Sequence, residues 1–349
     1  EREGYTMFKR GKRKSKIKTK DILSCVTKGD PAKTWSIEGQ IGEGATSTVH
    51  RVVRKEGGQV AAGKAIKCPS SADLEEFGVE VLLLSKQKHD SLIALVEGFW
   101  HKKTLWLMVE LATGGAFDDI LEAGGCKGLS EPQLRSVAAQ VTPGLAFLHS
   151  QGVWHRDIKA GNLLLTGDGR VKITDFSSCS LNNGDGKKRD TFLGSPFWMP
   201  PEVIACDMPK SKAKYDHKVD SWSLGVTLIE LGDGEVPWLH LSPYRAMLKI
   251  VKEPSPSFAD PHSWSDAAYD FIESACHKDP DDRQGCEELA HMPFASGPAD
   301  LDVLMPLAGL SHAGGAAGGA MDADEAFDGF ASGAPSPDGE PEPGGFGFT

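Results

Sequence analysis

The segments His155-Arg-Asp-Ile-Lys-Ala-Gly-Asn162 and Asp175-Phe-Ser177 decide the fold of this chain. Their polar side chains can form one site only if the twelve residues between them, 163–174, fold back on themselves. Two short apolar runs around a Gly/Asp turn predict a β-hairpin in that stretch. The runs and the turn occupy residues 163–166, 171–174 and 167–170. Such a hairpin would carry Asn162 and Asp175 to the same end of a cleft.

The polar residues of the two segments are the types that phosphoryl transfer requires. Asp157 can accept the proton of an attacking hydroxyl, and Lys159 can stabilise charge on the transferred group. Asn162 and Asp175 offer the oxygen ligands that Mg²⁺ prefers in sites shared with phosphates. The set therefore predicts a magnesium-dependent site for a phosphate donor.

Size and composition are typical of a globular protein larger than one average domain, with 349 residues, 40% hydrophobic and 25% charged. No apolar run approaches the roughly 20 residues that span a bilayer, and no signal-peptide pattern opens the sequence. Seven scattered cysteines without a C-x-x-C pair indicate reduced thiols in a cytosolic protein, rather than a disulfide frame or a zinc site.

The net charge of −11 is unevenly distributed. Residues 1–20 hold nine Lys or Arg against two Glu, whereas residues 295–349 hold nine Asp or Glu and no Lys or Arg. The mildly acidic part between them is not a platform for nucleic acid. We expect a cytoplasmic protein in which the basic residues 1–20 support entry into the nucleus. The alternatives for these residues are contact with anionic lipid or nucleic acid, or no role beyond that of a solvated tail.

The domain organisation follows from these composition shifts. Residues 296–349 are rich in Gly, Pro and acidic residues, cannot bury a core and are expected to be disordered, as are residues 1–33. The expected divisions are a basic arm and linker (1–33), a catalytic domain (34–295, with lobes 34–111 and 112–295) and an acidic tail (296–349). Within the tail, Phe327 and Phe330 lie among acidic residues, which indicates either a docking peptide or an inert solubilising segment.

Hydrophobic patterning predicts an α+β fold with two lobes. Strand-like runs between Trp35 and Lys67 predict three antiparallel strands, followed by a helix over 72–87 and strands at 93–100 and 104–111. Asp73 and Glu76 are placed as a capping box for that helix. The second lobe is expected to be helical, at 132–150 and near 217–231, 242–252, 265–276 and 286–291.

Two further motifs fit a nucleotide site. In the run Ile41-Gly-Glu-Gly-Ala-Thr-Ser-Thr-Val49, Gly42 and Gly44 let the backbone approach phosphates, although a plain glycine turn is an equal reading of the motif alone. In the run 60–67, strand alternation places Ala62 and Lys64 on one face and Lys67 on the other. This alternation favours Lys64 over Lys67 as the phosphate-contacting lysine.

With these residues in place, the chain resembles eukaryotic protein kinases over about residues 35–295. More narrowly, it is similar to the germinal-centre branch of the sterile-twenty-like serine/threonine kinases. The resemblance is carried by Lys159-Ala-Gly-Asn162, by the run from Arg189 to Met199, and by Ala61-Ala-Gly-Lys64 with Glu80 sixteen residues later. It implies a bilobal fold, ATP with Mg²⁺ (Mn²⁺ as an alternative) as cofactors, and Ser/Thr acceptors on protein substrates.

The resemblance also implies roles for individual residues. Glu80 would pair with Lys64, and the backbone of Glu110 and Ala112 would bind adenine. The other residues expected to line the nucleotide site are Ile41, Val49, Ala62 and Leu164.

In the segment after Asp175, the resemblance makes Thr191 a phosphorylation site for an upstream activating kinase, with Arg156 pairing with the phosphate. Ser195 would contact Asp157 and Lys159. Glu202 and Arg283 are expected to form a buried ion pair in the large lobe. Asp220 is expected to hold the backbone of residues 155–162, here termed the catalytic loop.

The sequence departs from the family pattern at three positions, and two of them, Ser177 and Ser47, motivate an alternative: a pseudokinase scaffold that binds nucleotide or partners without turnover. Ser177 replaces the glycine after Phe176, where a Cβ would penalise positive φ. The other two are Ser47 in place of a third loop glycine and Pro200 in place of alanine.

Overall fold

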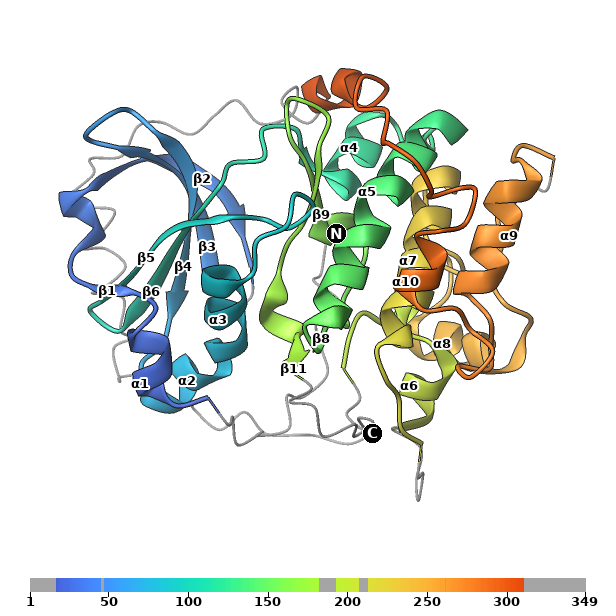
Figure 1. Ribbon diagram of the computed structural model, residues 1–349, viewed down its shortest axis with the longest axis horizontal. Coiled ribbons are helices and arrows are strands. Elements are labelled where there is room, and N and C mark those ends of the chain that lie inside the picture. Colours follow the sequence, from blue (N-terminus) through green and yellow to red (C-terminus); the bar gives the residue numbers. More distant parts are fainter. Residues whose placement is uncertain (1–16, 45–46, 182–192, 207–212, 261, 311–349) are drawn as a thin grey trace, which may run out of the picture.

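The computed structural model describes residues 17–310 apart from 45–46, 182–192, 207–212 and 261. It has a small lobe built on a β-sheet and a larger lobe built mainly of helices (Figure 1). The expected α+β bilobal fold is confirmed.

The small lobe contains a sheet of six strands in the order β1-β5-β6-β4-β3-β2. Five of them are antiparallel neighbours: β2 Trp35–Glu43, β3 Ser47–Arg54, β4 Val60–Lys67, β5 Leu95–His101 and β6 Thr104–Val109. One face of this sheet packs on Trp35 and Trp106, and the other packs on the helices. The side chains of β4 therefore divide between two apolar clusters, as period-2 alternation requires.

The helical part of the small lobe differs from the single helix expected over 72–87. It consists of α2 Ser71–Glu76 and α3 Gly78–Lys86, separated at Phe77 (φ −89°, ψ 3°). The capping box also differs, because it lies three residues earlier than expected, at Ser70 and Asp73. Ser70 is the N-cap: its hydroxyl accepts from the Asp73 amide at 3.2 Å, and its amide donates to the Asp73 carboxylate at 2.8 Å.

Residues 17–33 differ from the expected linker, because they fold against the small lobe. They contain α1 Thr19–Leu23, β1 Thr27–Lys28 and the short helix η1 Pro31–Lys33. β1 adds to the sheet edge in parallel with β5, and Ile22 of α1 is fully buried. The segment contains one short apolar cluster, Ile22, Leu23, Cys25 and Val26, which is too short to predict a helix or strand by periodicity.

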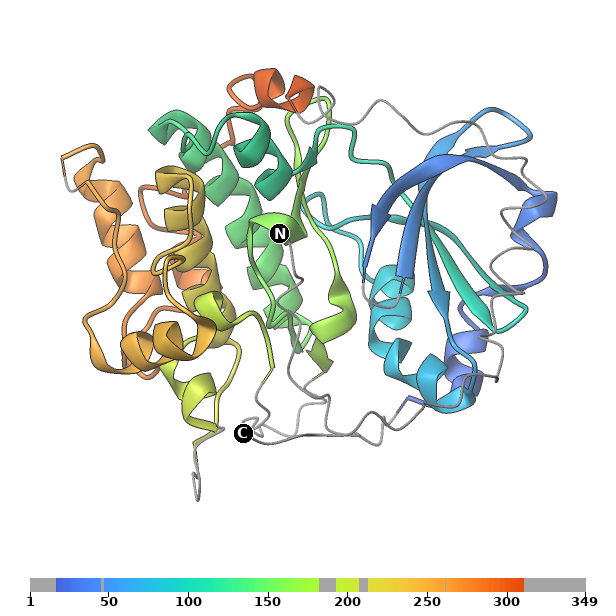
Figure 2. The same ribbon diagram turned by 180° about the vertical axis from the view of Figure 1, so that it is seen from behind.

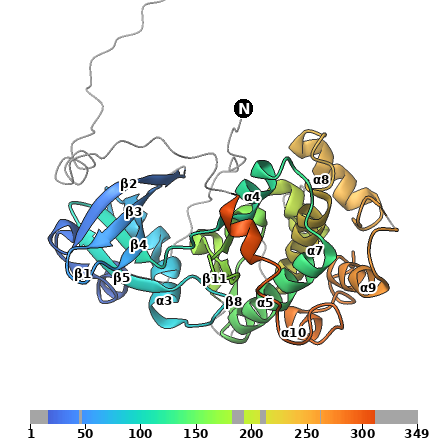
Figure 3. The same ribbon diagram turned by 90° about the horizontal axis from the view of Figure 1, so that it is seen from above.

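In the large lobe, α7 Lys218–Asp233 is the central element, since every residue from Val219 to Leu231 is buried. It packs against α5 Glu131–Ser150, α9 Asp266–Ala275 and α10 Cys286–Leu289 (Figure 3). Helix α8 Pro243–Lys252 and two short helices that the sequence patterns did not predict, α4 Phe117–Ala123 and α6 Pro201–Cys206, complete the helices of the described part. None of the described helices is long and apolar enough to cross a membrane.

The predicted hairpin is present between the two lobes. It consists of β9 Leu163–Leu165 and β10 Val171–Ile173, and β7 Gly115–Ala116 pairs with β9. A second pair joins β8 Val153–Trp154 to β11 Ser180–Leu181. Three short 3₁₀ turns follow or precede these strands: η2 Ala160–Asn162, η3 Phe176–Ser178 and η4 Pro196–Trp198.

Residues 296–310 also differ from the expectation of a tail without a core. Leu304 is fully buried, and the Ser136 hydroxyl of α5 donates to the carbonyl of Asp300 at 2.6 Å. The segment ends in η5 Met305–Gly309, drawn in orange-red at the top of Figures 1 and 2, next to α4. Phe327 and Phe330 lie outside the described residues.

Candidate active site

Asp157 is the centre of a polar cluster in the catalytic loop. Its carboxylate accepts hydrogen bonds from the Ser195 hydroxyl at 2.8 Å and from the Asn162 side-chain amide at 3.1 Å. The Lys159 ammonium donates to the Ser195 hydroxyl at 3.1 Å and lies 3.7 Å from the Asp157 carboxylate. A carboxylate in this setting can accept a proton from a hydroxyl placed beside it.

Asp220 of α7 binds the backbone of the catalytic loop. Its buried carboxylate accepts from the amides of His155 at 2.8 Å and Arg156 at 2.6 Å. It also contacts the His149 imidazole of α5 at 2.8 Å. Burial opposes charge on both groups, but their mutual attraction lowers the pKa of Asp220 and helps to raise the pKa of His149 to about 10. The position of Asp220 is the one expected from sequence.

Glu230, also on α7, supports the same loop and was not singled out from sequence. Its carboxylate accepts from the Ala160 amide at 3.1 Å and from the Trp198 indole N–H at 2.9 Å. Burial raises the pKa of Glu230 to about 7. The one available signal was a lone acidic residue inside an otherwise apolar run of α7.

Lys64 lies on the small-lobe side of the cleft and points toward α3. Its ammonium is 2.7 Å from the carboxylate of Glu80 and 3.6 Å from that of Asp175. Burial of Lys64 opposes its charge, but attraction to Glu80 and Asp175 raises its pKa above the usual value. Burial of Asp175 is likewise outweighed by Lys64, which lowers the pKa of Asp175. Lys67 lies exposed at the end of β4, so strand alternation selected the lysine that meets Glu80.

In the segment from Asp175 to Ser177, the residue with a strained backbone conformation is Asp175. Asp175 is left-handed (φ 59°, ψ 72°), and its carboxylate accepts from the Ser177 amide at 3.3 Å. Ser177 lies in η3 and is not among the described residues with positive φ. The steric objection to a Cβ at position 177 therefore does not apply in this conformation.

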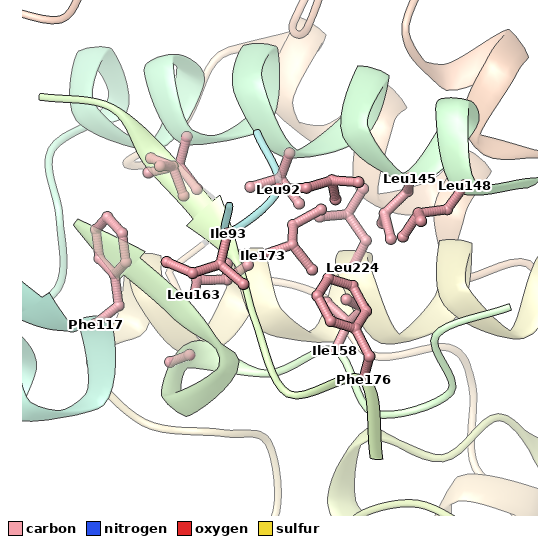
Figure 4. Close-up of a cluster of buried hydrophobic side chains, with 14 of the residues drawn as sticks. Leu92, Ile93, Phe117, Leu145, Leu148, Ile158, Leu163, Ile173, Phe176 and Leu224 are labelled. Carbon is pink, nitrogen blue, oxygen red and sulfur yellow. The ribbon is translucent and has the colours of Figure 1, made fainter. Parts of the chain in front are cut away.

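Phe176, between these two residues, is almost fully buried. It lies among the apolar residues beneath the cleft, near Leu224 and Ile158 (Figure 4). Its ring also meets the His155 imidazole edge-on at 5.5 Å between centroids. The buried ring anchors the segment so that Asp175 faces Lys64.

Asn162 and Asp175 fit the expected metal. The Thr174 amide donates to the Asn162 carbonyl at 3.0 Å, which places Asp175 next to the catalytic loop. Because the Asn162 side-chain nitrogen is used by Asp157, its side-chain oxygen is the atom available as a ligand. One carboxylate and one amide oxygen are a suitable protein donor set for Mg²⁺ shared with phosphates. Among the described residues, no group of three or more His, Cys, Asp or Glu forms a separate metal cluster.

The residues expected around the nucleotide lie on both sides of the same cleft. Gly42 pairs with Val49 across β2 and β3, and Ala62 pairs with Val109 at the start of the connection between lobes. The Gly44 amide donates to the Ser47 carbonyl at 2.8 Å and so closes the described part of the β2–β3 turn. Two apolar residues complete the set: Ile41, which is half exposed, and Leu164, which belongs to β9.

Glu110 is held by contacts on both its side chain and its backbone. Its carboxylate lies 2.9 Å from the Lys172 ammonium and accepts from the Ala94 amide at 2.8 Å. Its own amide donates to the Ala94 carbonyl at 2.9 Å. The group that Glu110 can offer to a ligand is therefore its carbonyl, with the Ala112 backbone two residues on. The contact with Lys172 was not expected from sequence.

The expected buried ion pair of the large lobe is present. Arg283 contacts both carboxylate oxygens of Glu202, at 2.6 and 3.0 Å, and its side chain has no exposed surface.

Thr191, the expected phosphorylation site, lies outside the described residues. Its expected partner Arg156 is buried and donates to the carbonyls of Ser178 and Cys179 and, at 3.2 Å, to the Tyr215 hydroxyl. The Arg156 guanidinium thus links the catalytic loop to the start of the segment that contains Thr191.

Comparison with known proteins agrees with this geometry. The protein kinase domain matches residues 35–295, and the chain belongs to the protein kinase family. Serine/threonine-protein kinase 10 of Homo sapiens is 41% identical over 268 residues, which cover 76% of this chain and 27% of that protein. Serine/threonine-protein kinase ste20 of Emericella nidulans is 34% identical over 286 residues, covering 82% of this chain and 33% of that protein.

A third relative, serine/threonine-protein kinase cst-1 of Caenorhabditis briggsae, is 35% identical over 277 residues, covering 79% of this chain and 54% of that protein. These relatives confirm the placement among sterile-twenty-like kinases. The chain spans less than a third of the length of the serine/threonine-protein kinase 10 proteins that it matches.

Proposed function

We propose that this chain is an ATP-dependent protein serine/threonine kinase that transfers the γ-phosphate to Ser/Thr hydroxyls of protein substrates. The observation that carries the proposal is the convergence of two clusters on one cleft: Asp157 with Lys159 and Asn162, and Lys64 with Glu80 and Asp175. The first is suited to act on a hydroxyl and the second on phosphates.

In the proposed phosphoryl transfer, each of these residues has a separate role. Asp157 accepts the hydroxyl proton, and Asn162 and Ser195 orient its carboxylate by hydrogen bonds. Lys159 places a positive charge beside the acceptor oxygen, where negative charge develops. Lys64, held by Glu80, fixes the phosphate chain on the opposite side.

The cofactors of the proposed activity are ATP and Mg²⁺, with Mn²⁺ as a substitute. When bound, the metal neutralises charge on the phosphates, and Asn162 and Asp175 would hold it. The carbonyl of Glu110 and the backbone of Ala112 would hold adenine, with Ala62 of β4 on one side of the ring and Leu164 of β9 on the other.

The test is transfer of labelled phosphate from Mg-ATP to a general acceptor such as casein. We expect transfer by the wild type, and a loss of about 100-fold or more in both Asp157→Asn and Lys64→Met. Chelation of the metal with EDTA should abolish transfer. Absence of transfer by the wild type, including after treatment with an upstream kinase, would refute the proposal.

Regulation, location and partners are extensions of this proposal. Phosphorylation of Thr191 would add negative charge near the buried guanidinium of Arg156 and so order the substrate site. The basic residues 9–20 would support nuclear entry of a mainly cytoplasmic kinase, and residues 320–330 would dock a protein partner through Phe327 and Phe330. No observation on the described residues favours the pseudokinase alternative, because the backbone of Ser177 is ordinary.

A further inference from the structure

The segment of residues 17–28, here termed the N-terminal brace, lies against the helix that carries Glu80. Figures 1 and 2 both show α1 beside α2 and α3, at the end of the small lobe away from β2. The segment is joined to the kinase domain match, which begins at residue 35, by η1. It is therefore an addition to the domain that touches its nucleotide-positioning helix.

The contact with α3 is close and apolar. Ile22 is fully buried in the cluster that also contains Leu74 and Val81. Gly78, the first residue of α3, has no side chain at this point: a Cβ there would lie 2.8 Å from Ile17 and 3.1 Å from Ile22. Both distances are shorter than ordinary carbon–carbon contacts, so the brace and α3 approach as closely as a glycine permits.

Two further contacts fix the position of the brace. The amide and the hydroxyl of Thr19 both donate to the carboxylate of Glu75 in α2, each at 3.0 Å. At the other end, Val26 lies over Gly98 of β5, where a Cβ would come within 2.7 Å of it, and β1 pairs with the same strand. The brace thus joins the sheet edge to both helices of the small lobe.

The opposite side of α3 faces the active site. Leu83 and Leu84 line a small cavity together with Phe176, the residue that follows Asp175. Glu80 projects toward Lys64 and is almost fully buried. Since α3 is only nine residues long, it cannot hold a fixed position by its own stability. Its place is set by Phe176 on the inner side and by the brace on the outer side.

We propose that the N-terminal brace is a positioning element for phosphoryl transfer, with Ile22 and Ile17 holding α3 where Glu80 pairs with Lys64. The inference rests on the proposed kinase function. The brace acts through α3, because its contacts are with α2, α3 and β5. Loss of the contact would allow α3 to move away, and the Lys64–Glu80 pair would then form in a smaller fraction of molecules.

The test compares Ile22→Ala with Ile37→Ala in the full chain. Ile37 is a matched control, because it is also buried in the small lobe but packs in the Trp35 cluster on the other face of the sheet. Both substitutions remove the same atoms from an apolar core. Kinetics are measured at a temperature at which thermal unfolding shows both variants to be folded.

We expect the kcat of Ile22→Ala to fall about tenfold with the KM for ATP within about twofold, and Ile37→Ala to stay within about twofold of wild type in both. The conservative variant Ile22→Val should keep most of the activity. Gly78→Ala should also lower kcat, because its methyl group displaces the brace. The loss in the double variant with Ile22→Ala should be smaller than the product of the single losses, since both disturb one contact.

Hydrogen exchange of the α3 amides gives a second readout that does not depend on activity. We expect faster exchange in α3 for Ile22→Ala than for Ile37→Ala. Equal kcat values and equal α3 exchange in the two variants would overturn the proposed role of the brace. A wild type without phosphate transfer would instead refute the kinase function, and α3 exchange alone would then decide whether the brace holds the helix.

Discussion

Neutralising the carboxylate of Glu202, which pairs with Arg283, should strongly destabilise the large lobe. The Arg283 side chain has no exposed surface, stacks over Trp222 at 5.1 Å and donates to the carbonyl of His277 at 2.9 Å. Glu202→Gln would keep the shape of the partner but leave this buried cation without a counter-charge. Breaking a buried pair in this way costs roughly 3–5 kcal/mol.

An exposed pair supplies the matched control. Lys249 of α8 and Glu253, the residue that follows this helix, are 3.9 Å apart, with side chains about half exposed. Such pairs contribute roughly 0–1 kcal/mol. At roughly 2 °C per kcal/mol for a chain of this size, Glu202→Gln should lower the unfolding temperature by about 6–10 °C and Glu253→Gln by about 2 °C or less. Thermal unfolding followed by circular dichroism measures both. Equal shifts in the two variants would refute the reasoning that burial makes this pair important.

Three other predictions follow from single residues. Burial raises the pKa of Glu230 to about 7, so the stability that the Glu230 carboxyl contributes is fully present below pH of about 4.5 and is lost as pH rises through about 7. Between pH 5 and 8, the unfolding temperature of wild type should therefore fall relative to that of Glu230→Gln. A parallel pH dependence of the two unfolding temperatures would contradict this. Lys64→Met should reduce phosphate transfer by about 100-fold and Lys67→Met by less than about twofold, because only Lys64 meets Glu80; equal losses would argue against the assignment. Ser177→Gly should leave kcat within about twofold of wild type, because position 177 needs no positive φ; a gain of tenfold would show that the Cβ restrains Asp175.

Local patterns were sufficient where the answer depended on neighbours in sequence. Period-2 alternation along β4 favoured Lys64 over Lys67, and Lys64 is the lysine of the two that pairs with Glu80. The short apolar runs around a Gly/Asp turn predicted the hairpin that joins Asn162 to Asp175. The same reasoning failed between residues 72 and 87. The apolar spacing continues through Phe77, but the backbone there leaves the helix and restarts at Gly78, where the brace comes close.

The sequence by itself determined the class of fold, the order of the motifs and the residue types that suit a phosphate site, because these depend on short-range periodicity and on side-chain chemistry. Only the tertiary structure decided which distant partners bury particular residues. The apolar residues near Ile22 do not indicate that it packs on α3, and Glu230 is one acidic residue in a helix that is buried on every side. Their roles arise from contacts with α3 and with the catalytic loop, which are distant in sequence. A local pattern can show that a segment is suited to burial, but it does not show which distant partner buries it.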